Sequence, residues 1–427
     1  MTDNNLRDNN GMLKSEMPEA GLETGDLNIK LENETEGITF DGLVWHSIVR
    51  MKDGSLMTGE GQQSMDEGRT WSKSKTFKSC VIKLKETPDI TRVGMLRLPN
   101  NELGFYYADK WTMTTALGND TNNWFFCWSS DEGKSWSEPV QITLPGLTMG
   151  LFDTMFALSN GRLILVTYTQ LLGSRFDKRG QTYGTYKGVR IATETEGHYP
   201  QFEAGRVYYS DDNGRCWKAC DGWIIGWRDD KWSDLFTEPC GVELKDGRIM
   251  LVGRTAIGRL SQAFSEDQGH SWWPGAQPME LMSSYSPARI GRIPSTGDLL
   301  IVWNQVSRAE IRKGFRRSRL SSAISKDEGK TWGHFKNIEA IKSLAPISQV
   351  PPDPDLTPVW ADPEIGQLPD DFGIFHYHNI VFIHDEVFIG YPVTTGYNIV
   401  SDENGQPETK PISHRRTKII PVKWFYK

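Results

Sequence analysis

Residues 129–136 read Ser-Ser-Asp-Glu-Gly-Lys-Ser-Trp, and the pattern S-x-D-x-G-x-(S/T)-W occurs five times in the chain, once with Cys216 at the Ser/Thr position. In each copy the Ser and Asp side chains can bond to the amides of a tight turn, and the Gly supplies a positive φ. The Trp is suited to packing between neighbouring sheets. The pattern predicts five structural hairpin turns, which begin at Ser64, Ser129, Ser210, Ser265 and Ser325.

A weaker repeat precedes each of these boxes. Apolar residues alternate along a strand, a polar turn follows and a second apolar strand returns, which is typical of a β-hairpin. This repeat occurs at residues 47–57, 94–107, 155–168, 242–254, 288–303 and 379–391. Five boxes and six hairpins imply six small sheets, with a degenerate sixth box at 401–405 and a last strand at 418–427.

Small four-stranded sheets that recur every ~50–80 residues predict an all-β fold, a six-bladed β-propeller. Residues 27–427 then form one propeller, whereas residues 1–26 are polar, poor in aromatic residues and predicted to be disordered. Two long insertions, 167–205 and the proline-rich 339–373, are expected to carry specificity or a subunit contact.

The composition excludes several classes of partner. The 427 residues include 48 Lys and Arg against 55 Asp and Glu, a net charge of −7, so no nucleic acid is expected to bind. No apolar run approaches the ~20 residues that span a bilayer, which argues against a membrane protein. The N-terminus does not read as a signal peptide, which predicts a cytoplasmic location. The five Cys lack a CxxC pair and are expected to be reduced, no cofactor or metal is expected, and the oligomeric state is left open.

The first strand of each propeller sheet lines the axis, so residues just before the hairpins converge on one face, the expected site. Two of them are polar, Glu238 and Tyr377. The turn at Asp246-Gly247 brings Glu238 nearly opposite Arg254, which predicts a charge pair at the mouth of the ring. Spacing alone leaves two interpretations open. Either Glu238 and Arg254 merely neutralise each other while Tyr377 fills the axis of the ring, or these residues form a reactive site.

The boxes, and the run from Glu238 to Arg254 in particular, resemble the sialidase (neuraminidase) superfamily of six-bladed propellers with Asp-box repeats, from about residue 40 to the end of the chain. The resemblance implies a glycoside hydrolase that releases terminal α-linked sialic acid, or a related acidic sugar, with retention. It implies Tyr377 as the nucleophile, Glu238 as the base that activates it, and Arg254 as an arginine that binds the substrate carboxylate. Arg317 is the best candidate for a further such arginine, with Arg316 and Arg319 as neighbouring alternatives.

The implied chemistry suits these residue types. A sialoside carries its carboxylate on the anomeric carbon, which repels a carboxylate nucleophile, whereas a Tyr deprotonated by a nearby Glu can attack. Arginine holds a carboxylate with two parallel hydrogen bonds, which lysine cannot do. The expected partner is therefore a sialylated or other acidic glycan.

The first unit departs from the family pattern. Val44 stands where the family has its first carboxylate-binding arginine, and no Asp stands where the family has its acid/base. Glu60, Asp109 and Asp153 are the candidates for that acid, and His46 is a candidate substrate contact. These departures leave three alternatives to the sialidase: another glycosidase, a carbohydrate lyase in which His46 or Tyr377 moves the proton, and a propeller that binds glycan without turnover.

Overall fold

The structure is a computed structural model. It describes residues 37–41, 47–73, 91–109, 112–113, 120–121, 123–143, 154–172, 182–192, 201–227, 233–344, 347–401 and 407–427. Within these ranges the regular secondary structure is almost entirely β-strand, with one short α-helix, α2 (Arg308–Arg312), and one 3-10 helix, η2 (Val422–Tyr426). The all-β prediction is confirmed. No helix of the described ranges is long and apolar enough to cross a membrane.

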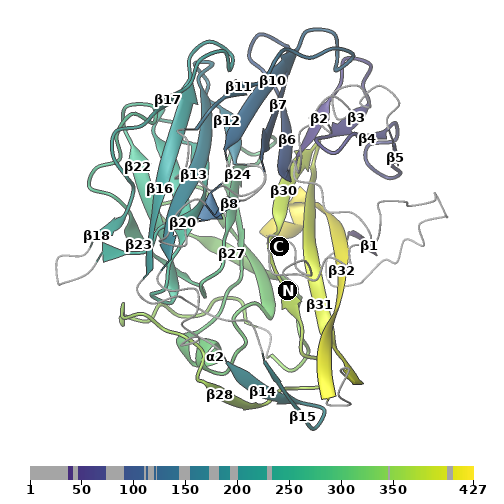
Figure 1. Ribbon diagram of the computed structural model, residues 1–427, viewed down its shortest axis with the longest axis vertical. Coiled ribbons are helices and arrows are strands. Elements are labelled where there is room, and N and C mark those ends of the chain that lie inside the picture. Colours follow the sequence, from purple (N-terminus) through teal and green to yellow (C-terminus); the bar gives the residue numbers. More distant parts are fainter. Residues whose placement is uncertain are drawn as a thin grey trace.

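The described strands form six larger antiparallel sheets, numbered here in chain order (Figure 1). Sheet 1 holds β2 (Ile48–Arg50), β3 (Leu56–Thr58), β4 (Gln62–Ser64) and β5 (Ser72–Lys73). Sheet 2 holds β6 (Thr91–Arg97), β7 (Leu103–Ala108), β10 (Trp124–Ser129) and β11 (Val140–Gln141). Sheet 3 holds β12 (Met155–Ala157), β13 (Leu163–Leu172), β16 (Gln201–Ser210) and β17 (Lys218–Ala219).

Sheet 4 holds β20 (Thr237–Glu243), β21 (Ile249–Arg254), β22 (Arg259–Ser265) and β23 (Gln277–Met282). Sheet 5 holds β24 (Arg289–Arg292), β25 (Leu299–Trp303), β26 (Arg319–Ser325) and β27 (Gly333–Ala340). Sheet 6 holds β29 (Ile374–Phe375), β30 (Asn379–Ile383), β31 (Glu386–Ser401), β32 (Pro407–Pro421) and β1 (Ile38–Asp41). All six predicted hairpins are confirmed as the first two paired strands of these sheets.

Sheet 6 joins the two ends of the described chain, because β1 pairs with β32 along its outer edge. The prediction of a strand over 418–427 is right only as far as Pro421. Beyond it the chain coils into η2, which lets Trp424 and Phe425 enter the apolar core shared by sheets 5 and 6. The candidate sixth box falls largely on residues 402–406, outside the described residues.

The five box turns have the predicted hydrogen bonds. In the second box, Ser129 Oγ accepts the N–H of Gly133 at 2.8 Å and Asp131 accepts the N–H of Ser135 at 2.9 Å. The corresponding two bonds are present in the other four boxes. The structural interpretation of the repeat is confirmed. The described cysteines, Cys127, Cys216, Cys220 and Cys240, are free thiols.

Each sheet packs its apolar residues against the next. Between sheets 4 and 5, for example, the fully buried Trp303 shares a cluster with Val252 and Leu260, and its indole N–H donates to the carbonyl of Met282 at 2.9 Å. Burial of such a large side chain, with its N–H group hydrogen-bonded, contributes strongly to the free energy that holds the two sheets together.

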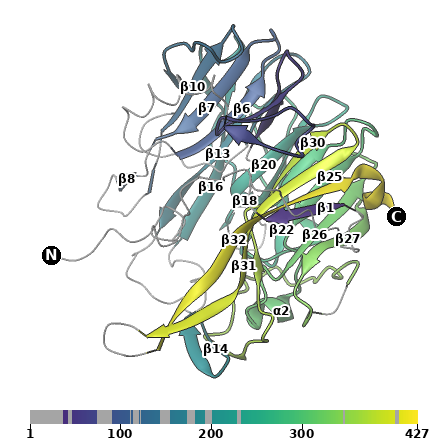
Figure 2. The same cartoon turned by 90° about the vertical axis from the view of Figure 1, so that its right-hand side faces the viewer.

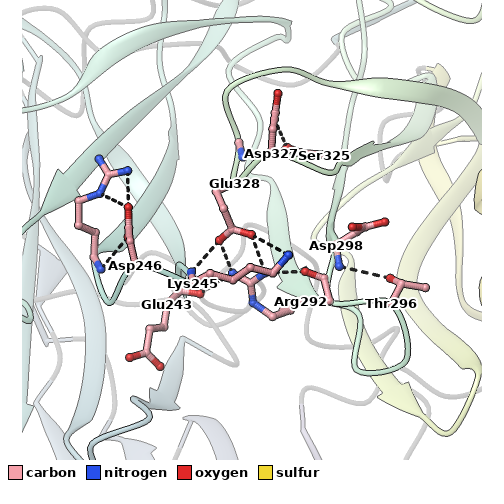
Figure 3. Close-up of polar contacts among 12 residues, drawn as sticks. Glu243, Lys245, Asp246, Arg292, Thr296, Asp298, Ser325, Asp327 and Glu328 are labelled. Atoms are coloured by element: carbon pink, nitrogen blue, oxygen red, sulfur yellow. Dashed lines mark hydrogen bonds and ion pairs between the residues drawn. The ribbon is translucent and has the colours of Figure 1, made fainter.

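Ion pairs or hydrogen bonds also join each box to the hairpin turn of the preceding sheet, as Figure 3 shows for sheets 4 and 5. Glu328 of the fifth box accepts hydrogen bonds from Arg292 of β24 at 2.7 and 2.9 Å, and from the backbone N–H of Lys245 in sheet 4 at 2.8 Å. Partial burial would raise the pKa of Glu328, but these donors lower it to about 2.

The same arrangement joins sheets 1 and 2. Glu132 of the second box accepts hydrogen bonds from Arg97 at 2.7 and 2.9 Å and from the backbone N–H of Lys52 at 3.0 Å. The bonds from Arg97, with those from Lys52, lower the pKa of Glu132 to about 2 against a smaller effect of burial.

A related contact joins the last sheet to the first. Glu67 of the first box lies 2.6 Å from Arg50 of β2 and 3.2 Å from Nε2 of His384, in the hairpin turn of sheet 6. Sheets 6 and 1 are therefore joined as consecutive sheets are, by a contact between the box of one sheet and the hairpin turn of the other.

The two long insertions meet each other. Strand β14 (Tyr183–Tyr186), from the first insertion, pairs with β15 (Val189–Ala192) and runs parallel to β28 (Glu364–Gln367), from the proline-rich insertion. The long hairpin of β31 and β32 extends down beside this small sheet in both views (Figures 1 and 2), and Tyr397 of β31 packs on Tyr186 and Phe372. Two minor pairs, β18 (Gly226–Trp227) with β19 (Ser233–Asp234) and β8 (Thr112–Met113) with β9 (Asp120–Thr121), complete the described strands.

Candidate functional site

Glu238 and Arg254 form a buried ion pair at the end of sheet 4 that lies away from its hairpin turn. Oε2 of Glu238 lies 2.6 Å from Nη1 of Arg254, and the two side chains are only 4% and 8% exposed. The backbone partner of Arg254 is Thr237, because the register shifts between Thr237 and Cys240. The predicted charge pair is present, although the backbone of Arg254 pairs with Thr237 and not with Glu238 itself.

Tyr377 brings a hydroxyl to this pair from sheet 6. It lies between β29 and β30, and its Oη is 3.5 Å from Oε1 of Glu238. The two residues are 139 positions apart in the chain. A phenol and a carboxylate at this separation need only a small adjustment for the carboxylate to accept the phenol's proton.

Arg317 lies against Tyr377 on another side. Its guanidinium carbon is 5.2 Å from the centre of the Tyr377 ring, and the Arg317 side chain is buried. Its Nη1 lies 3.1 Å from Nδ1 of His376. A guanidinium can only donate, so Nδ1 of His376 accepts, and the proton of the neutral ring is on Nε2.

The two neighbouring arginines are placed differently. Arg319 pairs with Glu310 of α2 at 2.9 Å, which ties the helix to β26. Arg316 is buried, and its carbonyl accepts a hydrogen bond from Ser284 at 2.6 Å. Of the three, Arg317 is the one whose guanidinium is found over Tyr377.

Two residues of the site were missed by the sequence reasoning. The ring of Tyr285 lies 3.9 Å from the guanidinium carbon of Arg254, and its hydroxyl donates to the buried carboxylate of Glu203. Tyr285 stands three residues before Ala288, the first residue of the fifth predicted hairpin, so it lies just outside that hairpin pattern. Glu203 is on β16, the third strand of its sheet, where no count of first-strand positions would find it.

The electrostatics of this group favour a fixed positive charge. Burial alone would lower the pKa of Arg254, but the charge of Glu238 raises it well above the usual value. Burial raises the pKa of Tyr285 well above its usual value, and Glu203 adds to that shift against the opposing charge of Arg254. Tyr285 is therefore a neutral hydrogen-bond donor beneath a permanent guanidinium.

The candidate acids have unequal surroundings. Asp109 accepts two hydrogen bonds from Asn123, one from the backbone N–H at 2.5 Å and one from the side-chain amide at 2.8 Å. Glu60 follows β3, and although the residue as a whole is exposed, loss of hydration around its carboxyl group raises its pKa, with the charge of Arg415 opposing the shift. Asp153, His46 and Val44 lie outside the described residues.

The histidines near Tyr377 do not form a metal site. Nε2 of His378 donates to the carbonyl of Val302 at 2.7 Å, and burial lowers the pKa of His378 to about 3. His384 lies at the other end of β30, beside Glu67. Throughout the described ranges, no group of three or more His, Cys, Asp or Glu side chains could hold a metal ion.

Comparison with known proteins gives a family match and several distant relatives. The family model of the BNR repeat-like domain matches residues 93–343, more than half of the chain. A sialidase from Micromonospora viridifaciens is 31% identical over 173 residues, which cover 37% of this chain and 24% of that protein. The chain thus spans about a quarter of the length of the curated relative it matches.

Comparison with solved structures gives matches at low sequence identity. A protein of unknown function from Dyadobacter fermentans has a TM-score of 0.50 at 15% identity, with 88% of this chain and 93% of that chain covered. A sialidase from Trypanosoma rangeli has a TM-score of 0.47 at 13% identity, with 93% and 59% covered.

Proposed function

The chain belongs to the BNR repeat-like domain family, in the sialidase superfamily, and we propose that it is a glycoside hydrolase that releases a terminal acidic sugar, with α-linked sialic acid as the first substrate to test. The observation that carries the proposal is the approach of the Tyr377 hydroxyl to Glu238 beside two buried arginines. A neutral nucleophile with its own base, next to fixed positive charge, suits a sugar whose anomeric carbon bears a carboxylate.

We also propose that the six sheets close into a six-bladed propeller. The bridge from Glu67 to His384 supports this, because it repeats between the last and the first sheet the kind of contact found between consecutive sheets. The pairing of β1 with β32 supports it as well, since a ring sealed by strands from both chain ends leaves few open edges.

In the proposed reaction, Glu238 accepts the proton of Tyr377 while the phenol oxygen bonds to the anomeric carbon and the bond to the leaving oxygen breaks. A water oxygen then bonds to the anomeric carbon as the bond to the Tyr377 oxygen breaks. Glu238 returns its proton to the tyrosine, and the proton that the water loses goes to the group that had protonated the leaving oxygen. Arg254 and Arg317 hold the substrate carboxylate. The buried Nε of Arg254 has no hydrogen-bond partner among the described residues, and a substrate oxygen would satisfy it.

The leaving oxygen needs a proton, and we propose Glu60 as its source. A raised pKa keeps a carboxyl group protonated at higher pH, which is what a general acid requires. Asp109 is less suited, because both of its carboxyl oxygens already accept hydrogen bonds from Asn123.

The direct test is release of 4-methylumbelliferone from its α-sialoside by the purified protein, measured over about pH 4 to 8. Tyr377→Phe and Glu238→Gln are each expected to lower kcat by roughly a hundredfold or more. Glu243→Gln, at the opposite end of the same strand β20, is the matched control and should keep wild-type activity.

Other outcomes would redirect the proposal. Undiminished activity in Tyr377→Phe would remove the tyrosine from the mechanism. An inert protein that instead forms an unsaturated, ultraviolet-absorbing product from uronate-containing glycans would be a lyase. A protein inert in both assays that still binds acidic glycans would be a binding propeller.

A further inference from the structure

Trp360, in the proline-rich insertion, lies next to the proposed site. Its ring packs edge-on against Tyr285, with 5.5 Å between the ring centres, and Tyr285 in turn lies against Arg254. The backbone N–H of the preceding Val359 donates to the carbonyl of Ala256, two residues beyond Arg254, at 2.9 Å. Trp360 is therefore in the layer just outside the Glu238 and Arg254 pair, and it is only partly buried.

Two buried arginines hold this insertion in place. Arg308 donates to the carbonyls of Ile257 and Thr357 at 3.0 and 2.9 Å, and lies 2.8 Å from the carboxylate of Asp355. Arg259 donates to the carbonyls of Met279 and Asp353. Each guanidinium bridges the rigid sheet region and the insertion, using several donors in fixed directions.

The sequence of the insertion limits its flexibility further. Five prolines lie within residues 350–363, and each fixes one backbone angle. The N–H of Val350 donates to Gln305 at 2.9 Å, and β28 pairs with β14 just beyond the segment. A side chain on such a segment is already in its working position, so binding costs little ordering entropy.

We propose that residues 348–363 form the outer wall of the site and that Trp360 binds the second sugar ring of the substrate, the one joined to the acidic sugar that is released. The inference rests on the proposed function and extends it to a substrate class, an acidic oligosaccharide rather than a simple glycoside. An aromatic face in the layer beyond the reacting group matches the apolar face of a neighbouring pyranose ring.

The test compares sialyllactose with methyl α-sialoside, which lacks a second sugar. Trp360→Ala is expected to lower kcat/KM for sialyllactose roughly fivefold or more, mainly through KM, and to stay within about twofold of wild type on methyl α-sialoside. Trp360→Phe should recover part of the loss. Arg308→Lys cannot donate the same set of hydrogen bonds to the insertion, so it should show the same loss of kcat/KM for sialyllactose and not for methyl α-sialoside.

The matched control is Trp273→Ala, because Trp273 is 87% exposed and follows the fourth box. Equal losses on both substrates, or no loss on either, would overturn the inference. If the wild-type protein hydrolyses neither substrate, the proposed function fails, and calorimetry with sialyllactose decides the inference. Weaker binding by Trp360→Ala than by wild type would support it, and equal or undetectable binding would overturn it.

Discussion

Glu238 and Tyr377 occupy the same position in two different sheets. Each lies at an extra position opposite the second strand of its hairpin, just before regular pairing resumes at Cys240 opposite Val252 and at Asn379 opposite Gly390. Each also has a left-handed backbone, with φ of 46° and 48°. A bulge of this kind redirects a side chain that the strand's alternation would have turned elsewhere.

The shared bulge explains how two strands from non-consecutive sheets bring a carboxylate and a phenol together. A left-handed conformation in a residue other than Gly costs on the order of 1–3 kcal/mol, and such residues cluster at functional sites. Strain and proximity coincide at these two residues, and Glu238 is also buried, which supports a reactive role for them.

Glu238 and Arg254 should each stabilise the folded protein only while the other is present. Glu238→Gln leaves the buried guanidinium without its countercharge, and we expect it to lower the free energy of unfolding by about 3 kcal/mol in urea denaturation. Glu238→Gln combined with Arg254→Met should recover at least half of that loss. A single variant as stable as the wild type would show that the charge is compensated elsewhere.

The two box carboxylates Glu132 and Glu328 should make stability depend on acid pH. Their pKa of about 2 in the folded protein lies below the ordinary value of 4.5, so their contribution is complete above about pH 4.5 and is lost as the pH falls towards 2. Glu132→Gln and Glu328→Gln should therefore be less stable than wild type at neutral pH, and this difference should shrink below about pH 4.5.

Urea denaturation at several pH values measures this dependence. Glu138→Gln serves as the control, since Glu138 is exposed and follows the second box. A stability difference that stays constant down to pH 2 would contradict the role assigned to the two carboxylates.

Glu60 should matter most for substrates with poor leaving groups. An alcohol needs a proton to depart, whereas 4-methylumbelliferone leaves readily as an anion. We expect Glu60→Gln to lower kcat for sialyllactose by about a hundredfold and to lower it much less for the fluorogenic sialoside. Asp109→Asn, measured in parallel, should not discriminate between the two substrates. The reverse result would transfer the acid role to Asp109.

The glycine of the third box should be irreplaceable for two separate reasons. Gly214 has φ of 89°, and an added Cβ would lie 2.1 Å from Phe126 of sheet 2. Gly247 has nearly the same φ, 85°, but open space around it. Gly247→Ala should cost about 1 kcal/mol from backbone strain alone, and Gly214→Ala several kcal/mol more from the overlap. Equal losses in thermal or urea denaturation would argue against the tight packing of this turn on sheet 2.

Local chemistry could be predicted from the sequence because each feature depends on residues close together in the chain. The box turns bond within eight residues, and each hairpin closes within about a dozen. The pair of Glu238 and Arg254 belongs to this class, since both lie in one hairpin. The amino-acid sequence by itself determined the repeat, the all-β class and this ion pair.

The tertiary structure decided everything that joins distant segments. The approach of Tyr377 to Glu238, the place of Arg317 beside Tyr377, and the contact of Trp360 with Tyr285 each depend on how separate sheets and insertions pack. The bulges that redirect Glu238 and Tyr377 break the period-2 pattern on which strand prediction relies, and the end of the chain coils into η2 because the core of sheets 5 and 6 accepts Trp424. Periodicity reports which residues are apolar along one strand, but the partner of a polar side chain from another sheet is set by packing over the whole fold.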